Sequence, residues 1–521
     1  MINKLGVAPE HYYTNYAAIP DHLKEEAVAR SAESPFRQLF HTEAASGYLN
    51  DPNGFSHFDG KYHLFYQWTP LKYTQEPNVW YQGWHHLISD DMVTWESLGP
   101  GIEPDTRFET HGAYSGSGWD NGDELLLFYT GNTRNEDWQR TPYQLLATMD
   151  RQGRIKKAAT PAISGTVPGY TDHFRDPKIW KTEEGYFAVI GAQRTDLTGA
   201  ALVLHSENGK TDWRVLGEVG TDRHTNFGYM WECPDYFELD GKGILLFSPQ
   251  GLAPKQNRFE NIYQIGYLVG SRIDKNNLSL REEGDFIELD RGFDIYATQT
   301  AILPDGRRIL SGWMGLPEIE YPTEAYGYCG CLLLPRELRL EDGRLKQRPI
   351  RELAAYETEE KVLSVRLNQD TAAERLAISF GHVLKLHCKN PAAGQLVIDL
   401  YSNEERTRYT RVLFDSVKGE VWLDRAKSGL PVGEAYGTKR LIWGGDLSEI
   451  ELALYLDRSS IELFLQDGLV TASARIFPDE SQQFVHMESL AGAWEVAGTQ
   501  AKLDMQAKPG KKEIHDAAHS L

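Results

Sequence analysis

DPNGFSHFDGKYHLFYQW (51–68) is the first of five stretches that repeat one plan; the others are YSGSGWDNGDELLLFYTG (114–131), DPKIWKTEEGYFAVIGAQ (176–193), ECPDYFELDGKGILLFSPQG (232–251) and YATQTAILPDGRRILSGWMG (296–315). Each has a polar cluster, a short apolar strand, a turn and a strongly apolar strand. The turn glycines are spaced by 62, 63, 56 and 65 residues and are Gly60, Gly122, Gly185, Gly241 and Gly306. Because glycine tolerates the positive φ of tight hairpin turns, each stretch predicts a β-hairpin in a repeating unit.

Further strand-like runs lie between these hairpins: WHHLIS (84–89), YQLLATM (143–149), ALVLHS (201–206) and YQIGYLVG (263–270). Four short strands in a unit of about sixty residues is the content of a propeller blade. The sequence therefore predicts an all-β chain with a five-bladed β-propeller over 36–346. A β-helix has a much shorter repeat, and a pair of β-sandwiches would not explain why one polar cluster recurs at the same place in each unit.

The repeat ends near Pro349, and the rest of the chain predicts a different unit. IRELAAYETEE (350–360) suggests a linker helix over 347–360, and alternating runs such as KVLSVRL (361–367) predict a β-sandwich over 361–500. A frayed tail is expected over 501–521. Residues 1–35 form an extension that is partly helical, with DHLKEEAVARSAE (21–33) as the helix.

Composition narrows the class of protein. A chain of 521 residues suits two folded units, and its 41% hydrophobic and 25% charged residues are typical of a soluble globular protein. The formal net charge of −21 disfavours nucleic acid and anionic lipid as partners. A small anionic substrate would need a local basic pocket, and the candidate cations are Arg134, Arg140, Arg194 and Arg258.

Targeting and metal signals are weak. Charged residues such as Asp21 and Lys24 interrupt the N-terminal region, and no run approaches 18 apolar residues, so we expect a cytoplasmic protein. The four cysteines do not form a disulfide framework, and the lone C-x-C at 329–331 suits burial better than a metal. His85, His86 and His111 lack metal-ligand spacing, so neither a metal nor an organic cofactor is expected.

Carboxylates recur at the starts of the predicted inner strands. The residues nine positions before the turn glycines are Asp51, Ala113, Asp176, Glu232 and Ala297. In a propeller these positions converge at one end of the central channel, so the three acids should share one pocket. A proline follows Asp51 and Asp176 directly, whereas Cys233 intervenes after Glu232, which indicates that one hairpin is a residue out of register.

Clustered carboxylates suit glycoside cleavage. One acid must be protonated to release the leaving oxygen, and the other must be ionised to meet an oxocarbenium-like centre. Crowding supports this division, because a neighbouring negative charge raises the pKa of one acid. Taken alone, Asp-Pro-Asn-Gly is an ordinary turn sequence, and it is the recurrence of acids at one place that favours catalysis.

These motifs resemble those of glycoside hydrolase family 32, the β-fructofuranosidases that include invertases, exo-inulinases and bacterial sucrose-6-phosphate hydrolases. The resemblance covers roughly 36–500 and rests on NDPNG (50–54), YSGSG (114–118), FRDPK (174–178), ECPD (232–235) and YATQT (296–300). GYMWECPDYFEL and GWMGLPEIEYPT are most similar to the bacterial cytosolic members. The resemblance implies a five-bladed propeller followed by a β-sandwich.

The resemblance also implies the roles of individual residues. Asp51 would be the nucleophile and Glu232 the general acid and base of a retaining reaction through a covalent fructosyl-enzyme. Asp176, with Arg175, would hold the fructosyl hydroxyls. Substrate contacts would come from Asn50, Gln67, Trp80, Tyr114, Ser115, Tyr296, Gln299 and Trp313. Tyr48-Leu49 replaces the family's usual Trp-Met, and Trp80 and Trp84 are one residue closer than is common, which puts the assignment of Trp80 in doubt.

Several functions remain compatible with these residues. The first is hydrolysis of sucrose 6-phosphate or sucrose, the second is hydrolysis of short fructo-oligosaccharides or inulin, and fructosyl transfer to another sugar is a variant of either. A carbohydrate-binding propeller without catalysis is an alternative from another class, although such a protein has no need of three clustered acids. A pentopyranosidase on a similar propeller would commonly invert the anomeric centre.

Overall fold

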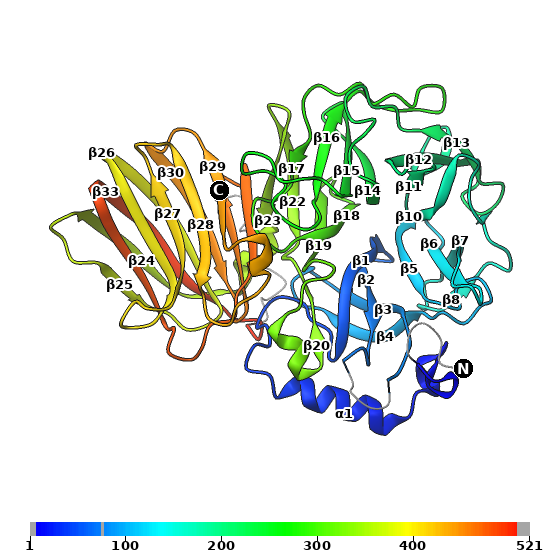
Figure 1. Cartoon of the computed structure of the whole chain (residues 1–521), viewed down its shortest axis with the longest axis horizontal. Coiled ribbons are helices and arrows are strands. Elements are labelled where there is room, and N and C mark those ends of the chain that lie inside the picture. Colours follow the sequence, from blue (N-terminus) through cyan, green and yellow to red (C-terminus); the bar gives the residue numbers. More distant parts are fainter. Residues whose placement is uncertain (1–6, 74–77, 508–521) are drawn as a thin grey trace.

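The repeated stretches form five antiparallel sheets arranged around an axis (Figure 1). The computed structural model describes residues 7–73 and 78–507.

Blade 1 contains β1 (Gly47–Phe58), β2 (Lys61–Thr69), β3 (Gly83–Ser89) and β4 (Glu96–Ile102). Blade 2 contains β5 (Ala113–Asp120), β6 (Leu125–Arg134), β7 (Arg140–Met149), β8 (Ile155–Lys157) and β9 (Ile163–Ser164). Blade 3 contains β10 (Tyr170–Thr182), β11 (Gly185–Arg194), β12 (Gly199–Ser206) and β13 (Arg214–Glu218). Blade 4 contains β14 (Met230–Leu239), β15 (Lys242–Gln250), β16 (Gly266–Gly270) and β17 (Ile287–Glu288). Blade 5 contains β18 (Tyr296–Ile302), β19 (Arg308–Met314), β21 (Cys331–Leu332), β22 (Arg336–Glu341) and β23 (Arg344–Pro349). The five-bladed propeller predicted from the repeat is confirmed.

The predicted hairpin turns join the first two strands of each blade. In Asp59-Gly60 and Asp240-Gly241 both turn residues have positive φ, 49° and 77° in each pair. Two consecutive positive φ values define a type I′ turn, whose twist matches that of the flanking strands. The turn chemistry read from the sequence therefore sets where each hairpin begins and ends.

A β-bulge interrupts the inner strand of every blade near its start. The pairing skips two residues in each strand: 50–51, 114–115, 176–177, 233–234 and 297–298. The offset of nine residues therefore does not place the three acids at equivalent positions. Asp51 is the second residue of its bulge, Asp176 is the first, and Glu232 precedes its bulge. A bulge redirects side chains, so neighbouring rather than equivalent positions supply the acids.

The propeller core lies between neighbouring blades. One apolar cluster joins blades 1 and 2, and others join blades 2 and 3, 3 and 4, and 4 and 5. The cluster between blades 5 and 1 also buries Leu23 and Ala27 of α1 (Asp21–Ala32), which lies where the sequence predicts a helix. β20 (Tyr328–Cys329) pairs in parallel with β1 and ties the end of the propeller to its start.

The second domain is a β-sandwich, shown on the left of Figure 1, as the sequence predicts. Its strands are β24 (Glu357–Asn368), β25 (Glu374–Ala377), β26 (His382–Ser402), β27 (Tyr409–Asp415), β28 (Glu420–Lys427), β29 (Lys439–Gly444), β30 (Glu449–Leu456), β31 (Ser460–Leu465), β32 (Val470–Arg475) and β33 (Phe484–Leu503). The long strands β26 and β33 pair with each other and run through both layers. The first half of β26 pairs with β30, and the second half pairs with β27. A large apolar cluster fills the space between the layers.

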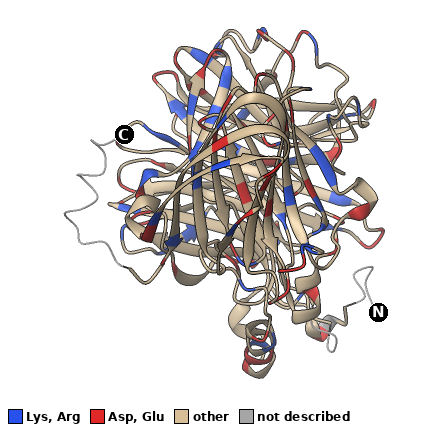
Figure 2. Cartoon of the chain, turned by 90° about the vertical axis from the view of Figure 1, so that its left-hand side faces the viewer, with Lys and Arg blue, Asp and Glu red and all other residues tan. Residues whose placement is uncertain are grey.

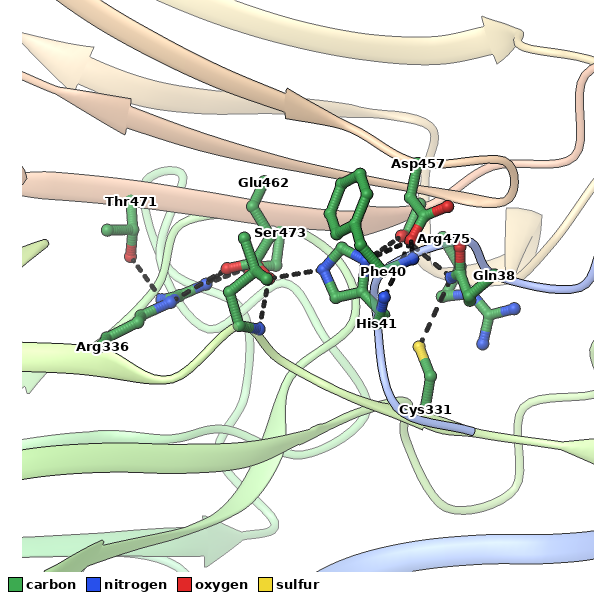
Figure 3. A network of polar contacts seen from close by, with 12 residues as sticks. Gln38, Phe40, His41, Cys331, Arg336, Asp457, Glu462, Thr471, Ser473 and Arg475 are labelled. Carbon is green, nitrogen blue, oxygen red and sulfur yellow. Dashed lines mark hydrogen bonds and ion pairs between the residues drawn. The ribbon is translucent and has the colours of Figure 1, made fainter. Parts of the chain in front are cut away.

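Buried charges join the two domains (Figure 3). His41 Nδ1 lies 2.8 Å from Asp457 Oδ2, and His41 Nε2 lies 2.7 Å from Glu462 Oε1. Arg336 of the propeller donates to the same Glu462 at 2.6 Å and to Ser473 at 2.6 Å. All these side chains are buried, and a buried charge is tolerated where it is paired and hydrogen-bonded. The network fixes the propeller against the sandwich.

The predicted linker helix over 347–360 is wrong at both ends. Residues 347–349 belong to β23, the helix is a 3₁₀ turn, η4 (Arg351–Tyr356), and β24 begins at Glu357. Pairing partners decide this: β23 pairs with β22, and β24 pairs with β33, far along the chain. Shorter 3₁₀ turns are η1 (Pro9–His11), η2 (Tyr16–Ala18), η3 (Pro322–Tyr326) and η5 (Glu434–Tyr436). The predicted tail begins inside β33, and its part after 507 lies outside the described residues.

Basic and acidic residues are interspersed along the sandwich strands (Figure 2). In the part of the chain that the structure describes, no helix has the length and apolar character needed to cross a membrane.

Candidate active site

Asp51 lies in the bulge of β1 and accepts three hydrogen bonds. Ser115 Oγ donates to Oδ2 at 2.5 Å, Asn50 Nδ2 donates to Oδ1 at 3.1 Å, and Cys233 Sγ donates to Oδ2 at 3.6 Å. Gln67 supports this arrangement, because its Nε2 donates to Ser115 Oγ at 3.0 Å and its Oε1 accepts from Asn50 at 2.7 Å. Donors around a carboxylate favour its ionised form.

Asp176 is brought to the same place from blade 3. The backbone N–H of Cys233 donates to Asp176 Oδ2 at 3.1 Å, so Cys233 contacts both Asp51 and Asp176. Asp176 and Cys233 have φ of 68° and 46°, which is uncommon for residues other than glycine. Backbone strain of this kind is maintained where the surrounding structure enforces it, and here it aims the two residues at each other.

Glu232 is held by three donors. Arg175 donates to its Oε1 from Nε at 3.0 Å and from Nη2 at 2.5 Å. Tyr296 OH and Gln250 Nε2 donate to its Oε2 at 2.6 Å and 2.7 Å. Arg175 Nε also lies 4.0 Å from Asp176 Oδ2. Arg175 and Cys233 therefore connect acids from blades 1, 3 and 4 into one cluster, which we call the acid cluster (Asp51, Asp176 and Glu232).

Burial and mutual repulsion set the protonation of the acid cluster. Burial raises the pKa of Asp176 to about 7, and the charges of Glu232 and Asp51 add to this against the opposing effect of Arg175. Burial also raises the pKa of Asp51, although the hydrogen bond from Ser115 opposes it. For Glu232, burial is outweighed by Arg175 and by the Tyr296 hydroxyl, and the pKa is lowered. The pocket thus holds acids whose pKa values are pushed apart, as acid–base chemistry requires.

Aromatic residues from the predicted set surround the acid cluster. The Tyr296 ring packs edge-on against Trp313 at 6.3 Å, and Trp313 packs edge-on against Tyr48 at 5.7 Å. The hydroxyl of Tyr114 accepts from Asn132 Nδ2 at 3.0 Å. Trp313 and Tyr296 are both buried.

Gln299 is a correction to the predicted set. Its Oε1 accepts from the backbone N–H of Phe55 at 2.9 Å, and its Nε2 donates to the carbonyl of Gly116 at 2.8 Å. The side chain is buried on the propeller axis and joins blades 1, 2 and 5. Because its amide is occupied by backbone groups, the side chain holds the blades together; it also lines the small cavity beside Asp176 and Cys233.

Trp80 lies at the rim, where the N-terminal segment reaches the propeller. Its ring stacks on that of Tyr12 at 6.4 Å, and Tyr12 also packs edge-on against His111 at 5.8 Å. No role could be assigned to residues 1–35 from the sequence. The structure places one of them, Tyr12, beside a residue that the resemblance implies for substrate contact.

Sequence reasoning missed Gln250 and Cys233. A signal for Gln250 was present, since a glutamine lies within the last three residues of the second strand in three blades, in FYQW (65–68), IGAQ (190–193) and SPQG (248–251). Cys233 offered only its position in the bulge, and no motif indicates that its sulfur and backbone N–H reach two different acids.

Two hollows lie along the propeller axis. A cavity of about 10 Å³ lies beside Asp176 and Cys233 and is lined also by Asp235 and Thr298. A much larger hollow, of about 1100 Å³, lies at the opposite ends of the inner strands, between residues such as Trp180. The acid cluster is absent from the lining of this larger hollow, and the small cavity beside Asp176 has room for about one water and not for a sugar. We therefore assign the chemistry to the acid cluster itself, at the end of the inner strands opposite the larger hollow.

A propeller that gathers two aspartates, a glutamate and an arginine at one end of its axis has the equipment of a glycoside hydrolase. Comparison with known proteins specifies the class. Residues 41–349 match the Glycosyl hydrolases family 32 N-terminal domain, and residues 341–504 match the Glycosyl hydrolases family 32 C terminal domain.

Relatives extend over nearly the whole chain. Sucrose-6-phosphate hydrolase of Staphylococcus xylosus is 39% identical over 93% of this chain and 96% of its own length. The structure of sucrose-6-phosphate hydrolase from Lactobacillus gasseri superposes with a TM-score of 0.86 at 33% identity, covering 95% of this chain and 98% of that one. The Bombyx mori GH32 beta-fructofuranosidase BmSUC1, solved as an aspartate-to-alanine mutant in complex with sucrose, gives 0.78 at 32% identity, covering 94% and 99%.

The chain belongs to glycoside hydrolase family 32. It is a glycosidase that hydrolyses β-fructofuranoside bonds.

Proposed function

We propose that the protein hydrolyses sucrose 6-phosphate by a retaining double displacement, with Asp51 as nucleophile and Glu232 as general acid and base. The observation that carries the mechanism is the acid cluster, in which Cys233 contacts Asp51 and Asp176 while Arg175 contacts Glu232. The substrate is proposed from the relatives named sucrose-6-phosphate hydrolase.

In the first step, a carboxylate oxygen of Asp51 attacks the anomeric carbon of the fructosyl unit. The bond from that carbon to the glycosidic oxygen breaks, and Glu232 gives its proton to the departing oxygen of the glucosyl unit. In the second step, Glu232 removes a proton from water, the water oxygen bonds to the anomeric carbon, and Asp51 leaves. Both substitutions invert the centre, so the net result is retention.

Catalysis requires protonated Glu232 and ionised Asp51, whereas the free site lowers the pKa of Glu232 and raises that of Asp51. Arg175 and Tyr296 favour ionised Glu232, whereas burial favours protonated aspartates. We propose that fructosyl hydroxyls take up donors of Arg175 and the carboxylate of Asp176 when the sugar binds. Release of Glu232 from the guanidinium raises its pKa, and the three donors on Asp51 keep the nucleophile ionised.

Substitution of the nucleophile tests the mechanism. Asp51→Asn should abolish turnover while the thermal unfolding midpoint stays close to that of the parent. Asp120→Asn is the matched control, because Asp120 is an exposed residue at the far end of β5. Proton NMR of the first product should show the β-anomer of fructofuranose. Full activity of Asp51→Asn, or an inverted first product, would refute the mechanism.

Kinetics on three sugars test the substrate. We expect kcat/KM on sucrose 6-phosphate to exceed that on sucrose and on 1-kestose by at least about tenfold, equivalent to about 1.4 kcal/mol of transition-state binding. Equal values for the first two sugars would remove the substrate proposal and leave the fructoside hydrolase. A charged sugar phosphate does not cross a lipid bilayer unaided, so we place the enzyme in the cytoplasm.

A further inference from the structure

Arg140 is a cation without a partner close to the acid cluster. Its Nε and Nη1 atoms are buried and have no hydrogen-bond partner among the described residues. The side chain begins β7, directly opposite Arg134 at the end of β6, and this hairpin end lies beside the start of β5. The guanidinium lies over the ring of Tyr114 with 5.9 Å to its centroid, and Tyr114 directly precedes Ser115. Arg140 therefore stands at the end of blade 2 that bears the site.

Two cations, Arg175 and Arg134, and one anion, Asp172, lie within electrostatic reach of Arg140. Burial, together with the charges of Arg175 and Arg134, lowers its pKa, while Tyr114 and Asp172 oppose this. His173, whose Nδ1 accepts from Arg175 at 2.8 Å, is also within electrostatic reach of Arg140. Unpaired buried charge costs free energy, and a protein with a net charge of −21 concentrates cations here. Binding of an anion beside the guanidinium of Arg140 would offset this cost.

The other arginines predicted for an anionic substrate are already engaged. Arg194 forms an ion pair with Glu218 at 2.7 Å. Arg258 lies 3.3 Å from Asp285 and also reaches Glu288. Arg134 donates to the carbonyl of Trp138 at 2.8 Å. Among the four, only Arg140 has neither an ion pair nor a side-chain hydrogen bond within the described part of the chain.

Arg140 lies on the side of the acid cluster to which we assign the leaving sugar. Glu232, the proposed acid, meets the glycosidic oxygen and is bonded to Arg175, which in turn contacts His173. We place the leaving glucosyl unit on the side of Arg140, because Arg140 lies over Tyr114, and the next residue, Ser115, donates to the nucleophile Asp51. Sucrose 6-phosphate carries its phosphate on this unit. The planar fork of a guanidinium matches phosphate oxygens with two parallel hydrogen bonds.

We propose that Arg140 binds the phosphate of the leaving sugar and is the residue by which the enzyme distinguishes sucrose 6-phosphate from sucrose. Arg134 strengthens the positive field without contacting the phosphate. The inference rests on the proposed function, because it assumes that the phosphorylated sugar is the substrate.

The test compares kcat/KM on sucrose 6-phosphate and on sucrose for the parent, Arg140→Gln and Arg140→Lys. Loss of a charge-assisted pair should reduce the ratio of the two values by about 10- to 100-fold in Arg140→Gln. Arg140→Lys keeps the charge but not the fork and should give an intermediate ratio. Arg258→Gln is the matched control and should leave the ratio unchanged. The inhibition constant of glucose 6-phosphate, the charged product, should rise in parallel in the Arg140 variants.

The outcomes separate this inference from the proposed function. A parent enzyme that prefers sucrose 6-phosphate, with an unchanged ratio in Arg140→Gln, overturns the role of Arg140 alone. An equal loss on both sugars also overturns it, because that result describes a residue that positions the site in general. A parent enzyme without preference overturns the substrate proposal and this inference together. If Arg140→Gln does not fold, Arg140→Lys tests the inference, because its ratio of kcat/KM on sucrose 6-phosphate to kcat/KM on sucrose must still be lower than that of the parent.

Discussion

Removal of one hydroxyl should shift the pH profile of this enzyme. Tyr296 donates to Glu232 Oε2 at 2.6 Å, and this hydrogen bond helps to lower the pKa of the acid. A hydrogen bond to a charged group contributes about 1.5–3 kcal/mol, and one pKa unit corresponds to about 1.4 kcal/mol. Tyr296→Phe should therefore raise the pKa of Glu232. Gln250 still donates to the same oxygen at 2.7 Å, so the free energy lost should lie at the lower end of this range.

The pH dependence of kcat measures this shift. In the complex with the sugar, where we propose that Asp51 is ionised, the basic limb of this profile reports loss of the proton from Glu232. Because the pKa of Glu232 rises, the basic limb should move to higher pH by about one unit, even if the maximal rate falls. The phenylalanine ring retains the packing against Trp313, so the fold should be unaffected.

Tyr263→Phe is the control for Tyr296→Phe. Tyr263→Phe removes a hydroxyl from a ring 5.9 Å from that of Tyr296, but this hydroxyl donates to Glu318 and not to Glu232. Its basic limb should stay in place. A Tyr296→Phe profile that coincides with the parent, or that shifts to lower pH, would show that Tyr296 does not hold ionised Glu232 or that another group sets the limb.

Three further perturbations have defined outcomes. Gln299→Leu leaves the N–H of Phe55 and a carbonyl unpaired and should lower the free energy of unfolding by about 2–5 kcal/mol in urea titrations; an unchanged midpoint would contradict the blade-packing role. Burial opposes protonation of His41, but Asp457 and Glu462 outweigh burial and raise the pKa of His41 from 6.5 to about 9. Protonated His41 therefore contributes about 3 kcal/mol to the free energy of unfolding below pH 6.5, and this contribution is lost as the pH rises through 9. The melting temperature should fall over this pH range in the parent but not in His41→Gln. Tyr12→Ala removes the ring stacked on Trp80 and should raise KM more than it lowers kcat, whereas unchanged kinetics would place Tyr12 outside the binding site.

Prediction from sequence was strongest where the cause is local. The five hairpins follow from turn chemistry within a few residues, as Asp59-Gly60 shows, and their regular spacing sufficed for the propeller. Prediction of the acid cluster depended on one further assumption, that residues nine positions before each turn glycine occupy equivalent places in the inner strands. The bulges break that equality, yet the acids still meet, because each bulge lies at the same end of its strand.

The sequence alone determined the number of blades, the all-β class and which three acids to join, because periodicity and turn residues act over short distances. Only the tertiary structure decided what each side chain contacts. The amide of Gln299 bonds to two other blades, Cys233 contacts two acids, and Arg140 Nε and Nη1 have no hydrogen-bond partner among the described residues. Such pairings join residues 50 to 250 positions apart, and the burial that shifts the pKa of Asp176 comes from the whole propeller. No local sequence pattern encodes these long-range pairings or this burial.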